Sequence, residues 1–483
     1  MIHFRAIGYV LGQLLLFFSI TMLLPLLYGI GGDVRDLIPL AIGFVATGAV
    51  GAGLFFLMPR PTREFTQREG MLLVVLIWSS VSFFGSLPFL FSPQYGTFTD
   101  AIFESVSGFT TTGATVLADV ESLSEPLQLW RCMSHWLGGM GIVVLAVAIL
   151  PLVGHGGMYL YRAEFSGAKS ERLKPRITET ALALWKLYFA FTVIEYLALR
   201  LAGMNNFESL CHTFSTLGTG GFSTRTASVA GFNDPTIEYI IIVFMLLAGI
   251  SFIQHYRFWV ERRPETALRD VEIKGYFALV AAATVIITGV LLARHGYALE
   301  PAFRSALFQV SSIVTTTGFV TDNFEVWHPL PQLMLLALMF VGGCTGSTAG
   351  GLKVSRILLL RGVIDREFKR MVERRGVFAV RLGGEVVPET AIQSVLNLVY
   401  LAFLINFVSC LALAALGVDV LTSIAAVAAS MFNIGPGLGA VGPLDNYGHL
   451  PALAKWVLSG CMIAGRLEFY TVLVILTPAF WRK

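Results

Sequence analysis

Long apolar runs separated by short charged segments make up most of this chain. Ten of the runs are long enough for a helix to cross about 30 Å of hydrocarbon, which takes roughly 20 residues. Because helices in soluble cores rarely stay apolar for that length, the pattern predicts an all-α membrane protein with ten transmembrane helices. The predicted spans are residues 7–30, 37–58, 70–92, 131–153, 180–202, 236–256, 275–294, 331–362, 392–416 and 452–479.

Four shorter apolar segments lie between some of these spans and are flanked by polar residues. Each has only about a dozen residues, which is too short to cross a bilayer. We therefore expect each one to enter the membrane as a half-helix and return through a loop. The four segments are residues 100–112, 208–220, 302–317 and 421–434.

Composition and charge support this interpretation and give it an orientation. Only 13% of the residues are charged, whereas soluble proteins average about 25%, and the mean hydropathy is +0.72. On the side of the membrane that holds both chain ends lie 25 of the 34 Lys and Arg residues. The positive-inside rule then places both termini in the cytoplasm, and all four half-helices enter from outside.

The half-helices belong to an internal repeat, because each ends in a tetrapeptide that contains glycine. Residues 101–113 also align without gaps with residues 306–318. Each repeat reads as helix, half-helix, loop and helix, so four pseudo-repeats are predicted to surround one central pore. The tetrapeptides are Thr111-Thr112-Gly113-Ala114, Thr219-Gly220-Gly221-Phe222, Thr316-Thr317-Gly318-Phe319 and Asn433-Ile434-Gly435-Pro436.

The spacing of these tetrapeptides predicts five structural units. An N-terminal two-helix domain precedes the first repeat, and the third repeat contains a glycine-rich segment at residues 342–351. The predicted units are residues 1–68, 69–175, 176–270, 271–385 and 386–483.

Four such loops around one axis can act as a selectivity filter for a cation. Backbone at membrane depth is tolerated only where it is buried in protein or lines a water-filled cavity. Carbonyl oxygens aimed at a common centre replace the hydration shell of an ion such as K⁺. Helices that enter from outside also point their negative C-terminal ends at that centre. A lone Thr-Thr-Gly would more simply indicate close helix packing, but four copies in matching places favour the filter.

On these motifs, essentially the whole chain resembles the Trk/Ktr/HKT superfamily of potassium transporters, and within it the bacterial TrkH/TrkG membrane subunits. The resemblance implies that K⁺ is the bound and transported ion and that backbone oxygens coordinate it. The presence of glycine at all four filter positions implies a preference for K⁺ over Na⁺. The implied K⁺-binding residues are Thr111, Thr112, Gly113, Thr219, Gly220, Gly221, Thr316, Thr317, Gly318, Asn433, Ile434 and Gly435.

Two further features at membrane depth are candidates for a gate. The first is the glycine-rich stretch of the eighth span, which either packs closely against another helix or forms a mobile loop beneath the filter. The second is Arg466, which either makes a structural ion pair, for example with Glu468, or places a positive charge at the pore constriction. The resemblance favours the gate in both cases. The candidate gate residues are Gly342, Gly343, Thr345, Gly346, Ser347, Thr348, Gly350, Gly351 and Arg466.

Other functions and partners are constrained more loosely. An ion-coupled secondary transporter, moving K⁺ with H⁺ or Na⁺ by alternating access, remains the alternative, although such proteins usually contain inverted repeats. An enzyme is not expected, because no catalytic constellation or organic-cofactor motif lies at membrane depth, and the five cysteines lack metal-ligand spacing. We expect a multi-pass protein of the bacterial inner membrane that contacts lipid and binds no nucleic acid.

The resemblance also implies two protein partners: a second copy of the chain in a homodimer, and a TrkA-like cytoplasmic subunit that binds nucleotides. The basic segments 158–176, 256–274 and 353–381 would offer the regulatory subunit a positive surface. The same segments also set topology and meet anionic lipid.

Overall fold

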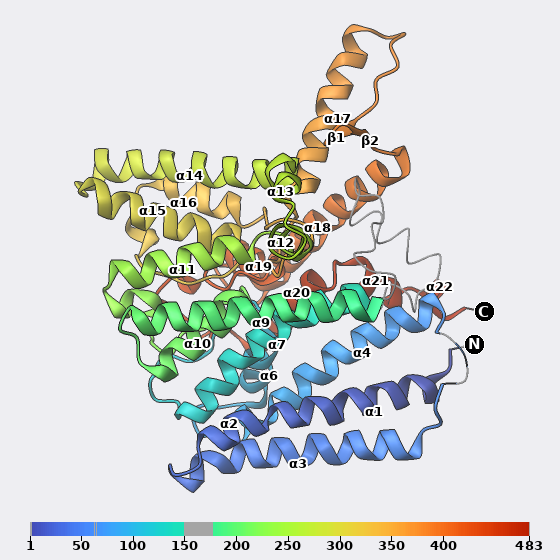
Figure 1. The fold of residues 1–483 in the computed structure, drawn as a ribbon, viewed down its shortest axis with the longest axis vertical. Coiled ribbons are helices and arrows are strands. Elements are labelled where there is room, and N and C mark those ends of the chain that lie inside the picture. The colour runs from blue at the N-terminus through green and yellow to red at the C-terminus, as the bar shows by residue number, and fades with distance from the viewer. Residues whose placement is uncertain (1, 62, 64, 149–176, 483) are drawn as a thin grey trace.

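The computed structural model describes residues 2–61, 63, 65–148 and 177–482. The end of the predicted fourth span and the basic segment 158–176 therefore lie outside the described residues. Most of the described chain is helical, and both termini lie at the same end of the helix bundle (Figure 1). The prediction of an all-α membrane protein is confirmed.

An N-terminal helix pair precedes a pattern of elements that occurs four times. The pair consists of α1 (Phe4–Thr21) with its continuation α2 (Leu23–Tyr28), followed by α3 (Val34–Leu57). Each later unit contains a long helix, a short helix, a loop and a second helix or pair of helices. The elements of the first unit are α4 (Gln67–Gly85), α5 (Leu87–Leu90), α6 (Phe98–Phe109) and α7 (Glu125–Ala148).

The other three units follow in chain order. The second contains α9 (Ile177–Leu201), α10 (Asn206–Leu217), η1 (Ser228–Phe232), α11 (Pro235–Ala248), α12 (Phe252–Trp259) and α13 (Pro264–Arg269). The third contains α14 (Val271–His295), α15 (Leu299–Val314), η2 (Phe324–Val326), α16 (Pro329–Leu338) and α17 (Val354–Val372). The fourth contains α18 (Glu389–Ala415), α19 (Val420–Met431), η3 (Gly439–Val441), α20 (Ala452–Arg466), α21 (Tyr470–Leu476) and α22 (Pro478–Trp481).

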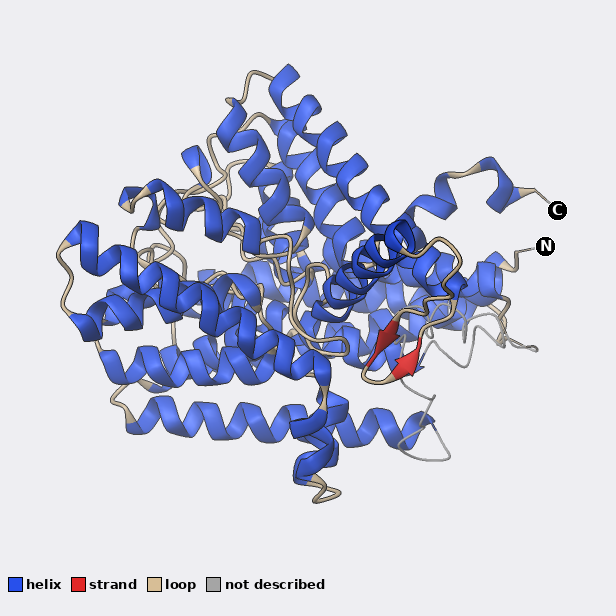
Figure 2. Ribbon diagram, turned by 90° about the horizontal axis from the view of Figure 1, so that it is seen from above, coloured by secondary structure: helices blue, strands red, loops and turns tan. Residues whose placement is uncertain are grey.

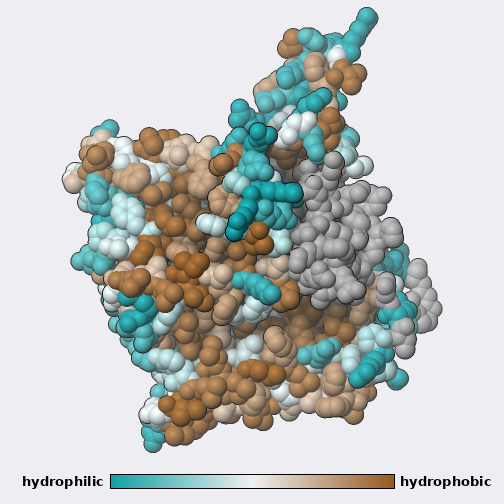
Figure 3. Space-filling model, in the orientation of Figure 1, coloured by the Kyte–Doolittle hydropathy of each residue, from teal (hydrophilic) through white to brown (hydrophobic). Residues whose placement is uncertain are grey.

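The described helices fit the predicted spans closely where those spans are straight. Six are long and apolar enough to cross a membrane, and the number rises to eight if each of two bent pairs counts as one span. The total of ten spans therefore remains a prediction. Large apolar side chains such as Leu57, Phe17 and Leu201 are exposed on the outside of the bundle. Figure 3 shows the apolar surface crossing the middle of one face, with polar residues concentrated toward its edges.

Two spans that the sequence predicted as continuous are sharply bent. Helices α11 and α12 meet at 101°, and α20 and α21 meet at 117°. The predicted eighth span is also broken, because residues 339–353 separate α16 from α17. Mean hydropathy over a window does not detect such breaks, since the helices on both sides of each break are apolar. Each break leaves backbone groups of the helix ends without intrahelical partners, and these groups must bond elsewhere.

The four short helices confirm the predicted half-helices, but each ends three residues before its predicted end. The chain leaves the helix at the tetrapeptides, whose threonine, asparagine and glycine residues are poor helix formers. N-cap side chains start three of the four helices: Thr97, Asn205 and Asp419 each accept a hydrogen bond from a first-turn N–H.

The segment that connects α17 to α18 extends beyond the bundle (Figure 1). It contains a two-stranded antiparallel sheet, β1 (Arg381–Leu382) with β2 (Glu385–Val386), in which Arg381 pairs with Val386. Figure 2 shows this small sheet, in red, beside the helices, in blue, and the loops that join them, in tan.

Candidate functional site

The four tetrapeptides share one backbone conformation. We define central loops 1 to 4 so that each begins one residue before its tetrapeptide and ends at the shared glycine. They are residues 110–113, 218–221, 315–318 and 432–435. The second residue of each loop lies in the left-handed region, with φ of 54° at Thr111, 54° at Thr219, 55° at Thr316 and 57° at Asn433. Left-handed backbone is a genuine outlier for a β-branched residue such as threonine. Three threonine outliers, together with an asparagine at the equivalent place in loop 4, indicate a conformation that the surroundings enforce.

Matching hydrogen bonds hold that conformation at the end of each short helix. The N–H of the third loop residue bonds to a carbonyl five residues earlier, at 2.8–2.9 Å in all four loops. The N–H of the second residue bonds to the carbonyl three residues earlier, at 2.9–3.3 Å. Together these bonds form a Schellman motif, which normally places glycine in the left-handed position. Here the last residue of the loop, not the left-handed one, is always glycine.

Those final glycines close the loops into a ring. A Cβ atom added to Gly113 would lie 2.0 Å from the carbonyl oxygen of Gly220 in loop 2. The same addition at Gly221 would meet Thr317 of loop 3, and at Gly318 it would meet Ile434 of loop 4, at 2.1 and 1.9 Å. The cycle ends where Gly435 faces the carbonyl oxygen of Thr112 in loop 1, at 2.7 Å for an added Cβ.

In every loop the carbonyl that meets the neighbour precedes the glycine, so the contact repeats with fourfold cyclic order. Only glycine allows this approach, because any side chain would collide with the next loop's backbone. Each of these glycines also has a positive φ, between 79° and 101°. The sequence prediction that the four loops meet at one centre is confirmed for their backbones.

The ring contains buried side-chain oxygens as well as carbonyls. Thr111 and Asn433 are fully buried, and Thr111 Oγ1 and Asn433 Oδ1 have no hydrogen-bond partner among the described residues. Asn433 Nδ2 donates to Thr112 Oγ1 at 3.0 Å, which links loop 4 to loop 1 by side chains as well. The C-terminal ends of α6, α10, α15 and α19 lead directly into the ring, so their dipoles favour positive charge there.

The glycine segment, residues 341–351, is folded against this ring and is not helical. Gly350 N donates a 2.6 Å hydrogen bond to Thr316 Oγ1 of loop 3. A Cβ on Gly350 would lie 2.4 Å from the carbonyl oxygen of Phe432 in loop 4. The segment is closed on itself by a parallel bridge between Val341 and Leu352. Close helix packing, the simpler interpretation of these glycines, is therefore wrong.

The break between α11 and α12 supplies partners for the glycine segment. Cys344 N donates to the carbonyl oxygen of Gly249 at 2.8 Å, and Phe252 N donates to the carbonyl oxygen of Gly346 at 3.1 Å. These bonds satisfy groups that a continuous helix would have paired internally. The broken sixth span is thus the site where the glycine segment is held.

Glu272, in the first turn of α14, ties the glycine segment to the start of α17. Its Oε1 accepts hydrogen bonds from Thr345 N at 2.8 Å, Thr345 Oγ1 at 2.9 Å and Ser355 N at 3.0 Å. Sequence reasoning missed this residue, because its charge fell at the predicted end of a span where acidic residues are common.

Arg466 contacts the glycine segment from the other side. The side chain is 5% exposed, and its guanidinium donates to the carbonyl oxygens of Thr348 at 3.0 Å and Gly138 at 3.1 Å. Nε has no partner, and no carboxylate among the residues described pairs with Arg466. The ion pair with Glu468 that the sequence left open is not present, because Glu468 pairs with Arg356 at 2.8 Å.

A buried ion pair lies behind loops 1 and 2 and was also missed. Arg131 Nε is 2.6 Å from Glu104 Oε1, and both side chains are at most 2% exposed. Glu104 also accepts a hydrogen bond from Val116 N at 2.9 Å, beyond loop 1, and Arg131 donates to Ser223 O at 3.0 Å, beyond loop 2. Glu104 lies in the middle of α6. Opposite charges on adjacent elements at membrane depth were the available signal.

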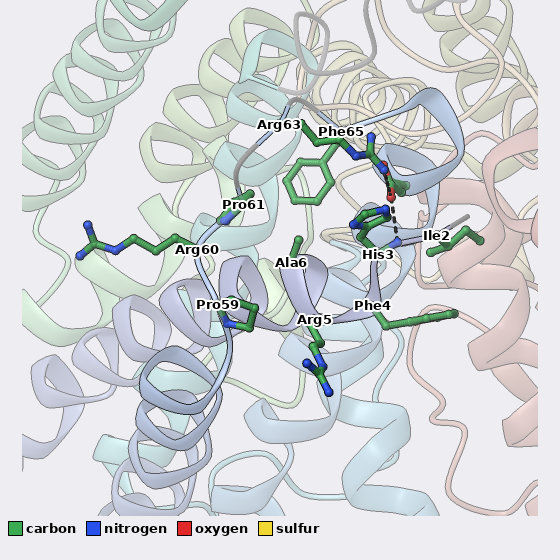
Figure 4. A pocket seen from close by; sticks show the side chains of 11 residues that line it. Ile2, His3, Phe4, Arg5, Ala6, Pro59, Arg60, Pro61, Arg63 and Phe65 are labelled. Carbon is green, nitrogen blue, oxygen red and sulfur yellow. Dashed lines mark hydrogen bonds and ion pairs between the residues drawn. The ribbon is translucent and has the colours of Figure 1, made fainter.

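The pocket at the chain ends is a separate feature. It has a volume of about 560 Å³ and lies between the start of α1 and the segment joining α3 to α4. In Figure 4, Arg5 and Arg60 extend away from the pocket, while Glu69 accepts hydrogen bonds from His3 N and Arg63. The pocket belongs to the N-terminal pair, and no cluster of metal-ligating side chains occurs in the described part of the chain.

Comparison with known proteins matches the chain over its full length. A family model described as "TrkH: Cation transport protein" matches residues 39–483. The chain is 44% identical over 486 residues to the Trk system potassium uptake protein TrkH of Salmonella typhimurium, with 100% of both chains covered. It is 34% identical over 484 residues to TrkG of Escherichia coli, covering 100% of this chain and 99% of the relative.

A solved structure agrees with these relatives. The crystal structure of the potassium transporter TrkH from Vibrio parahaemolyticus matches with a TM-score of 0.91 and 39% sequence identity, covering 100% of each chain. Family model, sequence relatives and three-dimensional fold converge, and the chain belongs to the TrkH family of cation transport proteins.

Proposed function

We propose that this protein takes up K⁺ across the membrane through the ring of central loops. The observation that carries the proposal is the closed contact of each ring glycine with the preceding carbonyl of the next loop. Four carbonyls held in cyclic order at a desolvated centre form the kind of site that substitutes for the water around a weakly hydrated cation. The family's relatives that are named as potassium uptake proteins support K⁺ as that cation.

In this proposal the ion is bound by backbone oxygens of the four loops. The unpartnered Thr111 Oγ1 and Asn433 Oδ1 support further coordination from side chains, because buried oxygens without partners are costly unless something binds them. The proposed K⁺-binding residues are Thr111, Thr112, Gly113, Thr219, Gly220, Gly221, Thr316, Thr317, Gly318, Asn433, Ile434 and Gly435. K⁺ is the substrate, and no organic cofactor takes part.

The glycine segment and Arg466 act as the gate. The segment contacts loops 3 and 4 directly, so a chain segment at this position obstructs an ion that leaves the ring. Arg466 adds an uncompensated positive charge beside it, which repels a cation in a medium of low dielectric constant. Opening requires the segment to exchange its bonds with Gly249, Glu272 and Arg466 for others. The proposed gate residues are Gly342, Gly343, Thr345, Gly346, Ser347, Thr348, Gly350, Gly351 and Arg466.

Partners and location follow from the same proposal. Both termini face the cytoplasm of a bacterial inner-membrane protein, as the distribution of basic residues favours. A nucleotide-binding regulatory subunit docks on the basic segments, of which 256–274 and 353–381 are described, and two copies of the chain form a homodimer. Native mass spectrometry of the solubilised protein tests the dimer, and co-purification with a candidate subunit tests the docking.

The transport proposal is tested by radioactive Rb⁺ uptake into proteoliposomes, with K⁺ or Na⁺ as competitor. We expect uptake that K⁺ abolishes at concentrations where Na⁺ has little effect. A second protein with residues 344–349 deleted shows whether a closed gate hides the activity. If neither protein carries Rb⁺ without a H⁺ or Na⁺ gradient, the ion-coupled transporter replaces the pore as the better interpretation.

A further inference from the structure

Central loop 2 differs from the other three loops at two positions. Loops 1 and 3 have threonine at the first and third positions, and in each loop the two hydroxyls bond to one another: Thr110 with Thr112 at 2.8 Å and Thr315 with Thr317 at 2.7 Å. This bond braces the loop just before its ring glycine. Loop 2 has Gly218 and Gly220 instead, so it has no side chains with which to make the brace.

Helix α7 fills the space that those missing side chains leave. A Cβ atom on Gly220 would lie 2.3 Å from Cγ and 2.4 Å from Nδ1 of the His135 ring. A Cβ atom on Gly218 would lie 2.5 Å from the carbonyl oxygen of the same histidine. The two glycines that replace threonines in loop 2, Gly218 and Gly220, are therefore explained by one residue on a neighbouring helix.

The imidazole of His135 also bonds to the loop. Phe222 N, directly after the ring glycine, donates to Nδ1 at 3.4 Å, so the ring is the neutral tautomer with its proton on Nε2. The imidazole stacks on the Phe222 ring with centroids 4.0 Å apart and an interplanar angle of 20°. His135 is fully buried, and its Nε2 has no partner among the described residues.

One turn earlier on α7, Arg131 holds the same phenylalanine. Its guanidinium carbon lies 3.6 Å from the Phe222 ring centroid, and Glu104 fixes the guanidinium from behind. The ring of Phe222 thus contacts two side chains that lie four residues apart, on one face of the helix. Loop 2 is held from outside, by α7, at the place where loops 1 and 3 hold themselves.

We infer that His135 is a positioning residue for ion selectivity. Its imidazole takes the place of the threonine pair and fixes the Gly220 carbonyl within the ring of central loops. The inference rests on the proposed function of the loops. Its structural consequence reaches loop 1, because the carbonyl oxygen of Gly220 is the atom against which Gly113 rests. A shift of that carbonyl changes one of the four loops that would coordinate the ion, and it also changes one of the four contacts between neighbouring loops.

The test is a double-mutant cycle on Rb⁺ uptake, with the ratio of K⁺ to Na⁺ competition as the readout. His135→Ala leaves loop 2 unsupported, and we expect the ratio to fall about tenfold, equivalent to ~1.4 kcal/mol of differential binding. Gly220→Thr alone collides with the imidazole and is expected to lower the ratio by at least as much. The double variant His135→Ala/Gly220→Thr places a side chain in the vacated space and is expected to recover most of the loss.

Leu137→Ala is the matched control, since Leu137 packs in the apolar clusters beside the same helix and its truncation removes comparable volume. The inference is overturned if Leu137→Ala lowers the ratio as much as His135→Ala does. It is also overturned if the fold-loss of the ratio in the double variant is as large as the product of the fold-losses in the two single variants. Failure of the proposed function is recognised separately, because the unsubstituted protein would then show no K⁺-selective uptake in the first place.

Discussion

The Arg466 guanidinium donates a 3.0 Å hydrogen bond to the carbonyl oxygen of Thr348, which lies near the middle of the glycine segment. The same guanidinium also donates a 3.1 Å hydrogen bond to the carbonyl oxygen of Gly138 on α7. The arginine therefore ties the fourth unit to the third and the first. One substitution of Arg466 therefore both breaks these hydrogen bonds and removes the positive charge.

Arg466→Ala should raise Rb⁺ uptake in the absence of any regulatory partner. A unit charge about 5 Å from an ion at an effective dielectric constant of ~20 opposes it by on the order of 3 kcal/mol, so an increase of about tenfold or more is expected. Arg68→Gln, which removes one positive charge near the chain ends, should leave uptake unchanged. Uptake that stays at the unsubstituted level in Arg466→Ala would exclude the arginine as a barrier.

Glu272→Ala should loosen the glycine segment without touching the ring. Three hydrogen bonds to one carboxylate oxygen are lost, and two of their donors are backbone N–H groups. Each buried donor left unsatisfied costs about 1–3 kcal/mol, so the closed arrangement is disfavoured and basal uptake rises while the K⁺ to Na⁺ ratio is retained. Glu265→Ala, at an exposed position of α13, serves as the comparison; equal uptake in the two variants would argue against the anchor.

Alanine at the ring glycines should act in a graded way. At Gly318 the added Cβ would lie 1.9 Å from Ile434 O, whereas at Gly435 it would lie 2.7 Å from Thr112 O. Both positions have a positive φ, so the backbone penalty is similar and the collision decides. We expect Gly318→Ala to lose more K⁺ selectivity than Gly435→Ala. Gly96→Ala, which meets nothing within 4 Å, is the control; the reverse order of the two ring variants would contradict the cyclic packing.

Glu104→Gln should destabilise the protein strongly, because it leaves Arg131 buried without a counter-charge. Removing one partner of a buried ion pair typically costs about 3–5 kcal/mol of stability. Replacing both residues, as Glu104→Gln/Arg131→Met, removes the uncompensated charge and should recover part of that loss. Thermal unfolding in detergent measures both effects, and a double variant less stable than Glu104→Gln would show that the charge is not the cause.

Much of the fold could be predicted because hydropathy and length decide it. The straight spans and the four half-helices are set by apolar segments whose lengths either reach across a bilayer or do not. The ring could also be anticipated, since Gly113, Gly221, Gly318 and Gly435 recur at matching places. Each of these features depends on residues that are close together in the sequence, so the sequence pattern alone predicts it.

The contacts between units could not be predicted in the same way. The bends at Gly249 and after Arg466 leave the mean hydropathy of the whole span apolar, and the groups that bond at each break belong to another unit. Glu272, His135 and Glu104 each act on a segment more than ten residues away in sequence. A single sequence gives the polarity of such residues but not what they face.

Four unequal loops on one chain give this molecule a freedom that an assembly of four identical subunits lacks. In a symmetric tetramer every substitution appears four times around the axis. Here loop 2 has two glycines and an imidazole in place of the hydroxyl pair, and loop 4 has a phenylalanine, an asparagine and an isoleucine where loops 1 and 3 have threonines. A single chain with four different loops thus allows each quadrant of the ion path to be altered separately, provided that its glycine still fits the neighbouring quadrant.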